Sequence, residues 1–351
     1  MVTGKKTRWG LFPQLGMMIS KDRVTVMRRA RLNKQTDDTL PGSQAEDIVL
    51  DTGTVDEERL YLPLQLYDRL RTWRKETGPK LASVYLYVPD GQALLRTFTY
   101  PRLKRADIPA FLRTEQALGR LMPLDQPFLT YTILSEAENT MRLAVSALPE
   151  KTVRLYSDTL TALGYRIIRI LPAVYAYAPY FVRGYGSSAG RLIGIVRRPD
   201  GMKVVIVENG QPVFIRTFTR PMDQPGLEDG TDDAKKKHAP LGRSAQSAEH
   251  DAQDAQSIER VIRFARNALF SGDQTIQAMC VMDLVEEAHT SQFIRLLREL
   301  QEADTVCEMD DKFFRPSLEH WLLFSALYPA PLKKKKEHAF GVYSKQGGRK
   351  R

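Results

Sequence analysis

The stretch that most constrains the fold is residues 190–220, GRLIGIVRRPDGMKVVIVENGQPVFIRTFTR. Three segments rich in apolar and β-branched residues alternate here with two tight turns, Pro199-Asp200-Gly201 and Asn209-Gly210. The segments are Leu192–Arg197, Lys203–Glu208 and Pro212–Phe218. Asn-Gly is a strong hairpin signal because both residues tolerate positive φ. The stretch therefore predicts an antiparallel meander of three strands.

A shorter version of the same pattern lies near the N-terminus. Leu15–Ser20 and Val24–Arg31 are separated by the polar pair Lys21-Asp22, and Asp47–Leu50 supplies a short return strand. Each of these two groups of strands is followed by alternating helix and strand patterns, which is typical of a duplicated α/β protein. In such a protein a phosphate could be held at the turns between the strands. The residues in those turns therefore bear on function.

The remaining elements follow from hydrophobic periodicity and from turn residues. Helices are predicted at 60–75, 108–122, 152–163, 173–182, 258–270, 291–300 and 318–327. Strands are predicted at 83–88, 93–100, 128–134, 141–147, 167–170, 276–282 and 305–309. Gly164 is expected to end the 152–163 helix in the left-handed conformation. Residues 222–256 contain almost no large apolar side chains, so we expect this stretch to be disordered.

Composition limits the class of protein. With 351 residues, 42% of them hydrophobic and 27% charged, the chain is long enough for two domain-sized cores. No apolar run approaches the about 20 residues that cross a bilayer, and the N-terminus lacks a signal-peptide pattern. Cys280 and Cys307 have no CxxC spacing, so we expect reduced, buried thiols in a cytoplasmic protein.

Basic charge is concentrated at the two ends of the chain. Residues 1–34 carry nine basic residues and one acidic residue, and residues 332–351 carry eight and one. The ends therefore sum to +15 and the middle to −5, which gives the net +10. These ends are either solvated tails or contacts to anionic lipid, in which case the contact is Lys333, Lys334, Lys335 and Lys336. Aromatic residues do not interleave with them, so nucleic-acid binding is disfavoured.

Four stretches, taken together and in order, resemble the PilM family of actin-like proteins from type IV pilus assembly. They are Leu15–Thr25 (an opening strand pair), Val84–Pro101 (two strands around Pro-x-Gly), Glu115–Pro123 (EQALGRLMP) and Asn209–Arg216 (NGQPVFIR). Each motif is weak alone, but the ordered set extends over residues 12–330. The resemblance implies an α/β, duplicated actin-like (ribonuclease H-like) fold with a small α+β subdomain inserted in the first half.

The resemblance also implies the domain limits. The first half would comprise residues 12–100 and 165–189, interrupted by the inserted subdomain at 101–164. The second half would be residues 190–330, followed by a basic tail at 331–351.

The residues expected to bind a nucleotide depart from the family pattern. In the family's register, the two Asp-x-Gly phosphate loops fall on Met18 and Ser20 and on Val196 and Arg198. The glycines that approach adenosine fall near Asp283-Leu284. Carboxylates in these loops hold Mg²⁺ or its water, and glycines let backbone N–H groups approach phosphate. Because methionine and valine do neither, we expect no bound cofactor or metal and no ATP hydrolysis.

The resemblance implies a non-enzymatic cytoplasmic scaffold, peripheral at the inner face of the membrane, in a type IV pilus or related secretion machine. Its partner would be the cytoplasmic N-terminal segment of a membrane-anchored PilN-like protein, docked in the first half beside the inserted subdomain. One alternative is an ATP-binding actin-like protein that uses substitute carboxylates such as Asp22 and Asp200. Another is a nucleic-acid-binding module that works through the basic ends.

Three further motifs favour no activity. Residues 186–190 match GxSxG, but a helix precedes Ser188 and a strand follows it, the reverse of a nucleophile elbow. Asp51-Thr52-Gly53 resembles an aspartic-protease loop, which needs two carboxylates sharing a proton. A homodimer could supply the second carboxylate, but helix-like sequence follows where strands are required, so we interpret the motif as a turn. The five histidines show no HxxxH or HExxH spacing for a metal; they are His238, His250, His289, His320 and His338.

Overall fold

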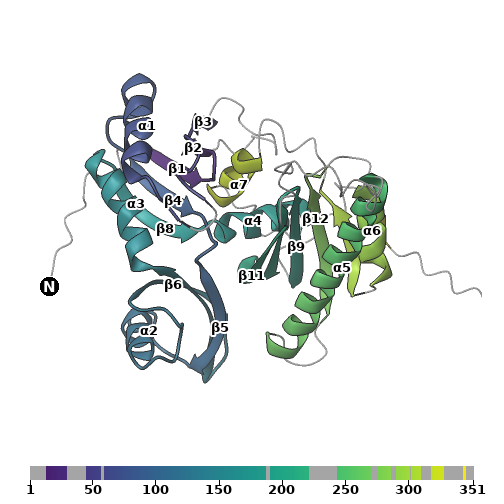
Figure 1. Cartoon of the computed structure of the whole chain (residues 1–351). Helices are drawn as coiled ribbons and strands as arrows, with labels where there is room; N and C mark the ends of the chain where they lie inside the picture. The colour runs from purple at the N-terminus through teal and green to yellow at the C-terminus, as the bar shows by residue number, and fades with distance from the viewer. Residues whose placement is uncertain are drawn as a thin grey trace, which may run out of the picture. The chain divides into compact units, whose positions relative to one another are not determined.

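The computed structural model describes residues 13–29, 45–56, 59–186, 190–220, 243–269, 275–285, 290–300, 302–309, 318–327 and 343–344. The chain divides into two units. The first contains the described parts of Met1–Arg183, Gln211–Val213 and Asp311–Pro331, and the second contains those of Gly184–Gly210, Phe214–Asp310 and Leu332–Arg351. Among the described helices, none has the length and apolar content needed to span a membrane. Figure 1 shows the course of the chain and labels most of its helices and strands.

The first unit contains a five-stranded sheet in the order β3-β2-β1-β4-β8. Its strands are β1 (Gln14–Ile19), β2 (Arg23–Arg29), β3 (Ala45–Val49), β4 (Ser83–Val88) and β8 (Arg166–Pro172). β1 is antiparallel to β2, and β2 to β3, whereas β4 is parallel to both β1 and β8. An antiparallel meander is thus extended by parallel strands, which need helical connections between them.

The second unit repeats this arrangement in a six-stranded sheet, β11-β10-β9-β12-β13-β14. Its strands are β9 (Arg191–Arg198), β10 (Gly201–Glu208), β11 (Gln211–Thr219), β12 (Ile276–Asp283), β13 (Ala303–Glu308) and β14 (Tyr343–Ser344). β9 is antiparallel to β10 and parallel to β12, which in turn is parallel to β13. At the β10–β11 turn, Asn209 and Gly210 have φ of 49° and 76°, as the hairpin signal predicts. The two sheets confirm the duplicated α/β architecture.

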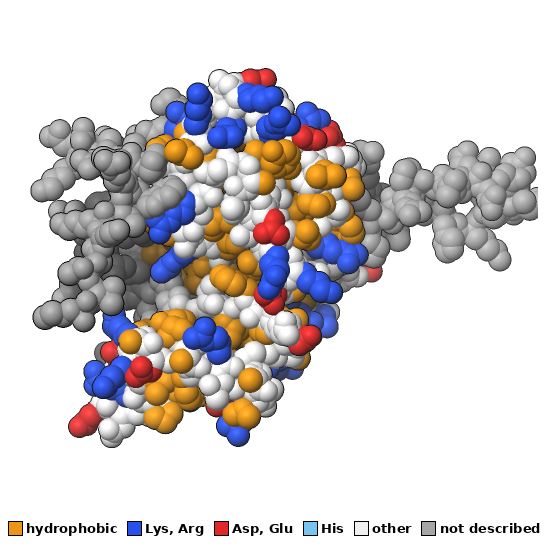
Figure 2. Space-filling model, turned by 90° about the vertical axis from the view of Figure 1, so that its left-hand side faces the viewer, with side chains coloured by type: hydrophobic (Ala, Val, Ile, Leu, Met, Phe, Trp, Pro, Cys, Tyr) orange, Lys and Arg blue, Asp and Glu red, His pale blue; other side chains and the backbone are white. Residues whose placement is uncertain are grey.

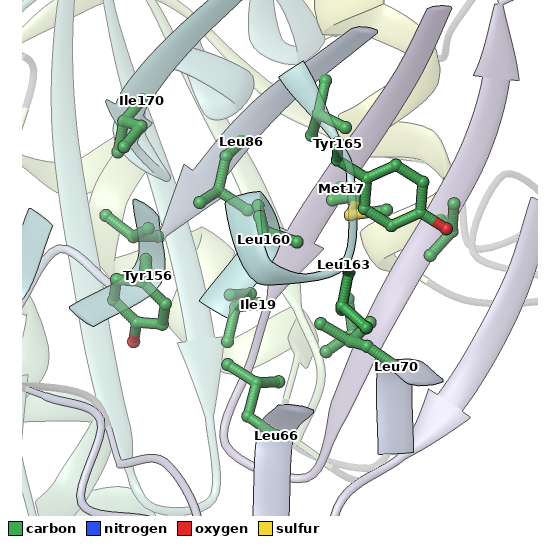
Figure 3. Close-up of a cluster of buried hydrophobic side chains, with 14 of the residues drawn as sticks. Met17, Ile19, Leu66, Leu70, Leu86, Tyr156, Leu160, Leu163, Tyr165 and Ile170 are labelled. Atoms are coloured by element: carbon green, nitrogen blue, oxygen red, sulfur yellow. The ribbon is translucent and has the colours of Figure 1, made fainter. Parts of the chain in front are cut away.

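Two helices, α1 (Pro63–Glu76) and α3 (Glu150–Ala162), pack on one face of the first sheet (Figure 3). Leu66 and Leu70 of α1 and Leu160 of α3 are almost fully buried among residues of β1, β4 and β8. The four-residue spacing of the two leucines places them on the same side of α1. Gly164 follows α3 with φ of 78°, so the predicted left-handed helix end is present.

A separate three-stranded sheet in the first unit has the order β5-β7-β6. It consists of β5 (Leu94–Pro101), β6 (Pro127–Glu136) and β7 (Thr140–Pro149), with α2 (Ile108–Ala117) packed against it. The structure differs from the predicted limits of the inserted subdomain at both ends. β5 pairs with β7, so the small sheet includes strand residues before 101. Helix α3 packs in the core of the large sheet and not in that of the small one.

The last described helix, α7 (Leu318–Leu327), belongs to the first unit and not to the predicted second half. His320 Nε2 lies 3.1 Å from Asp47 Oδ1 of β3, and Thr25 of β2 donates a 2.6 Å hydrogen bond to the same oxygen. Gly16 of β1 makes room for the helix, since a Cβ at this position would lie 2.7 Å from Leu327. A helix late in the sequence thus packs on strands that form near its start.

The prediction that residues 222–256 are disordered is wrong from residue 243 onward. Helix α5 spans Arg243–Ala268, while residues 221–242 lie outside the described residues. The segment rich in Ala, Gln and Ser has adequate helix propensity despite its few large apolar side chains. Two of its acidic residues, Asp251 and Asp254, are buried against the second sheet. Charged contacts therefore dock a segment whose hydrophobicity is too low to predict a core helix.

Candidate functional site

A groove of about 680 Å³ lies in the first unit, between the small sheet and the edge of the large one. Helix α4 (Val174–Tyr185), which follows β8, contributes one residue to its lining. The groove is lined by Pro109, Leu112 and Arg113 of α2, residues 127–132 of β6, Ile168, Arg169, Ile170 and Leu171 of β8, Tyr175 of α4, and Gln211, a residue of β11 that belongs to the first unit.

The groove runs along the edges of two strands. β6 and β8 each contribute consecutive residues, 127–132 and 168–171. Side chains alternate between the two faces of a strand, so a cavity over one face would be lined by every second residue. Both strands are terminal in their sheets as described, β6 beside β7 and β8 beside β4. Such an edge presents backbone N–H and C=O groups to an incoming segment.

The groove combines accessible apolar side chains with positive charge. Phe128 is 38% exposed and Ile168 is 40% exposed, so both apolar side chains are accessible to a ligand. The charged side chains in the described lining are Arg113 and Arg169, and both are exposed. On the face shown in Figure 2, patches of hydrophobic side chains are bordered by Lys and Arg. The lining therefore suits a ligand with apolar groups and negative charge.

Tyr175 adds a polar group on the α4 side of the groove. Burial raises the pKa of Tyr175, and the hydroxyls of Thr130, Ser146 and Thr132 only partly oppose this effect. The phenol therefore remains protonated at neutral pH and lies in a cluster of hydroxyl groups. Thr130 also donates a 3.3 Å hydrogen bond to Ser146. These groups can exchange hydrogen bonds with a ligand, whereas a cavity lined only by hydrocarbon could not.

The first predicted phosphate loop contains no free carboxylate. Met18 lies inside β1, paired with Thr25 of β2 and Tyr87 of β4, and is 2% exposed. Ser20 follows the strand, and its N–H donates a 2.9 Å hydrogen bond to the carbonyl of Arg23. Asp22, the substitute carboxylate considered above, lies 2.7 Å from the Arg23 guanidinium. The carboxylate nearest this turn is therefore already paired with a cation.

The second predicted loop is similar in this respect. Val196 is buried inside β9 opposite Lys203 of β10. Arg198 is the last residue of β9, and its carbonyl accepts a 3.1 Å hydrogen bond from Arg220. Asp200, the other substitute carboxylate, lies in the turn between β9 and β10 and is partly exposed. Neither Val196 nor Arg198 supplies a ligand for a cation.

A buried arginine, Arg197, links this strand to the predicted adenosine position. Its guanidinium donates to Asp283 at the end of β12 (3.1 Å) and to Asp254 of α5 (2.9 Å). It also donates to Asp251 of α5, and it lies 4.4 Å from the ring centroid of Phe293 in α6 (Thr290–Glu299). The Arg197 side chain is 1% exposed. Asp283 therefore serves as an internal partner for a cation of the same chain.

A second arginine, Arg220, also pairs with Asp254. We refer to Arg197, Arg220, Asp251, Asp254 and Asp283 as the arginine cluster. Three carboxylates thus face two guanidinium groups. Burial alone would lower the pKa of Arg197, but the charges of Asp283, Asp251 and Asp254 raise it above its ordinary value. Arg197 therefore stays charged, and its stability in the core depends on all three carboxylates remaining in place.

Sequence reasoning found Arg198 and Asp283 but missed Arg197, which is the centre of the cluster. A signal was available in Asp251 and Asp254, which are three residues apart and so lie on one side of a helix. The expectation that this stretch is disordered assigns no partner to its acidic residues.

The other sequence motifs give no site in the described part of the chain. Asp51 is ion-paired with Arg69 of α1. Ser188, His238, His289, His338 and the cluster Lys333, Lys334, Lys335 and Lys336 lie outside the described residues. His320 contacts Asp47 as given above, and the described residues contain no group of three side chains able to hold a metal ion.

Comparison with known proteins identifies the fold. No protein-family model and no curated protein matches the chain. Among solved structures, a PilM–PilN type IV pilus biogenesis complex is similar with a TM-score of 0.57 and 12% identity, covering 90% of this chain and 96% of that one. A Bacteroides thetaiotaomicron protein with an actin-like ATPase fold gives 0.42 and 11%, covering 93% and 98%.

The cytoplasmic domain of EpsL, from the type II secretion system of Vibrio cholerae, gives a TM-score of 0.39 and 11% identity, covering 78% and 83%. The similarity to the structure that contains PilM confirms both the predicted resemblance and the actin-like fold.

Proposed function

We propose that this protein is a non-enzymatic, cytoplasmic scaffold of a type IV pilus or related secretion machine. In this proposal its groove binds the cytoplasmic N-terminal segment of a membrane-anchored, PilN-like protein. The observation that carries the proposal is the groove between two strand edges in the first unit. The similarity to a PilM–PilN complex supports the choice of partner.

The groove favours one mode of binding. An extended segment that lies along a sheet edge gains main-chain hydrogen bonds from the strand, and its alternate side chains enter pockets. The lined part of β6, residues 127–132, matches an extended segment of about six residues. Its apolar side chains would contact Phe128 and Ile168, and a carboxylate would pair with Arg113 or Arg169. The partner segment we expect is therefore short, extended, apolar and acidic at one point.

The test is binding of a labelled synthetic peptide that carries the N-terminal residues of a PilN-like protein from the same genome. Arg169→Glu should weaken binding at least tenfold, or about 1.4 kcal/mol. Arg154→Glu is the matched control, since Arg154 is an exposed arginine of α3 that does not line the groove. Equal effects of the two variants would place the peptide elsewhere.

A second measurement tests the strand geometry. Along an added strand only alternate backbone N–H groups point to a given neighbouring strand. If the peptide pairs with one strand edge, N-methylation of one alternate set of peptide amides should therefore abolish binding, while methylation of the other set should leave it nearly unchanged. Equal sensitivity at every position would contradict pairing with a single edge even if the peptide still binds in the groove.

We also propose that the protein does not use ATP. The residues at the expected loops are Met18, Ser20, Val196 and Arg198, and Asp283 is held by Arg197. Calorimetric titration with Mg²⁺-ATP should give no binding heat, and Met18→Asp alone should not restore it because the second loop is equally altered. Micromolar binding by the unmodified protein would instead support the alternative of an ATP-binding protein that uses Asp22 or Asp200.

Membrane contact through the basic tail remains a proposal that rests on charge alone. If Lys333, Lys334, Lys335 and Lys336 contact anionic lipid, their replacement by Gln should reduce sedimentation with anionic vesicles. Each lysine near the surface contributes about 1 kcal/mol, and the effect should weaken with added salt. Vesicle binding that is the same for both proteins would leave protein contacts alone to hold the scaffold at the membrane.

A further inference from the structure

Two cysteines face each other in the second sheet. Cys280 of β12 and Cys307 of β13 are direct partners in the register of these parallel strands. Both are free, and they are 0% and 2% exposed. Partnered residues of neighbouring strands project to the same face, and their Cα atoms are about 4.8 Å apart. That separation lies within the range of about 4.4–6.8 Å found in disulfides.

The two thiols are already in contact and differ in acidity. A hydrogen bond joins them, and it lowers the pKa of Cys307 in spite of burial. The same hydrogen bond, together with full burial, raises the pKa of Cys280. Because the thiolate is the nucleophile in thiol oxidation, Cys307 is the sulfur expected to react first. Cys280 is then positioned as the resolving thiol.

We propose that Cys280 and Cys307 form a reversible intramolecular disulfide when the protein meets a small peroxide. The Cys307 thiolate attacks one oxygen of hydrogen peroxide, the O–O bond breaks, and hydroxide leaves, so that Cys307 becomes a sulfenic acid. Cys280 loses its proton and attacks the Cys307 sulfur, forming the S–S bond and expelling the second oxygen as water. Two thiols are oxidised by two electrons, and one peroxide is reduced to two waters.

The position of the cysteine pair determines how peroxide reaches it and what the disulfide would change. Hydrogen peroxide is nearly as small as water, and local opening of a strand near the sheet margin can admit it. The described pairing of β13 with β14 covers Thr305 and Val306, so Cys307 lies just beyond it. The bond would close the segment between residues 280 and 307, which includes α6. Phe293 of that helix stacks on Arg197, so oxidation would restrict the movement of the helix that contacts this buried arginine.

The test uses the full chain and hydrogen peroxide. After a brief exposure, the protein is unfolded in guanidinium chloride so that the buried thiols become accessible, free thiols are alkylated with N-ethylmaleimide, and the intact mass is measured. We expect a protein that has lost two hydrogen atoms and carries no alkyl group, returning to two alkylated thiols after dithiothreitol. Its melting temperature should be higher than that of the reduced protein, since the bond constrains the unfolded chain.

Single variants separate this outcome from others. Cys280→Ser should stop at a Cys307 sulfenic acid that dimedone traps, whereas Cys307→Ser should react far more slowly. Unmodified protein that keeps two alkylatable thiols while folded, or that forms only disulfide-linked dimers, would overturn the proposal. So would dimedone labelling of the unmodified protein without loss of both thiols, because Cys280 would then not act as a resolving thiol.

Discussion

Helices α1 and α3 of the first unit are fixed to their sheet by contacts of a different kind from those of α5 and α6 in the second unit. In the first, α1 and α3 dock through apolar side chains such as Leu70 and Leu160, which are 1% and 2% exposed. In the second, α5 and α6 also contribute apolar residues, but they converge on the charged Arg197. Apolar burial stabilises each contact separately, at about 25 cal/mol per Å². A buried charge is stabilised only when its partners are all present.

The comparison teaches that similar topology does not imply similar sensitivity to change. Removing a methyl group from the first core costs part of one contact. Removing one partner in the cluster leaves the remaining charges without compensation in a site that excludes water. We therefore expect a single substitution in the cluster to destabilise the second unit more than a single substitution in the apolar core destabilises the first. Three substitutions test this expectation, from the largest expected effect to the smallest.

Arg197→Ala should have the largest effect, because it leaves Asp251, Asp254 and Asp283 without their shared cation. We expect a loss of about 3–5 kcal/mol in the free energy of unfolding, with hydrogen-exchange protection lost first in peptides of the second unit. Arg263→Ala is the control, since this arginine is 70% exposed in an (i, i+4) pair of α5 and should cost about 0.3–0.5 kcal/mol. If the two variants lost similar amounts of unfolding free energy, the buried ion pairs of Arg197 would not be essential for the stability of this unit.

Leu160→Ala should rank next and act only on the first unit. Truncation of a buried leucine costs about 2–5 kcal/mol, depending on how far the cavity collapses. The loss should be insensitive to added salt in urea unfolding, because no charge is exposed. Leu155→Ala on the same helix is the control; Leu155 is 39% exposed, and its removal should change stability by about 0.5 kcal/mol or less. If the loss of unfolding free energy in Leu160→Ala depended strongly on salt, the contrast between apolar contacts in the first unit and charged contacts in the second would be wrong.

Asp47→Asn should have the smallest effect and a distinctive pH dependence. Burial tends to raise the pKa of Asp47, but hydrogen bonds from His320 and Thr25 and the charges of His320 and Arg23 outweigh it, so the net pKa is lowered. Its stabilising contribution is therefore present above the unfolded pKa of about 3.9 and is lost as pH falls through the folded pKa. We expect a loss of about 1–3 kcal/mol at neutral pH.

The unfolding free energies of Asp47→Asn and the unmodified protein should begin to converge as pH falls past the unfolded pKa of about 3.9, and should meet below the lowered folded pKa of Asp47. Urea unfolding across this range measures the convergence. A constant difference at all pH values would mean that the aspartate carboxylate acts by packing and not by charge.

Local rules predicted the meanders well because their signals are short-range. Asn209-Gly210 specifies its turn through backbone conformation alone, and the structure has positive φ at both residues. Helix α7 was predicted with its observed limits, Leu318–Leu327, by the same kind of local signal. Its placement in the first unit was not predicted, since that depends on Gly16 and Asp47, about 300 residues earlier in the chain.

The failures came from partners that are distant in sequence. Hydrophobicity alone does not predict the helical part of residues 222–256, because it does not show that Asp251 and Asp254 pair with the buried Arg197. The groove was expected beside the inserted subdomain only through the family resemblance. Its lining by the edges of β6 and β8 depends on sheet order, which one sequence does not reveal.

The position of α7 has a consequence for how the chain is made. A ribosome releases residues 14–29, which form β1 and β2, long before it releases Leu318–Leu327, the helix that packs on them at Gly16. During most of synthesis the first sheet therefore lacks one of its covering helices and exposes apolar surface to other nascent chains or to chaperones. Although domains usually fold from the N-terminus as they emerge, the first unit here must be completed among the last.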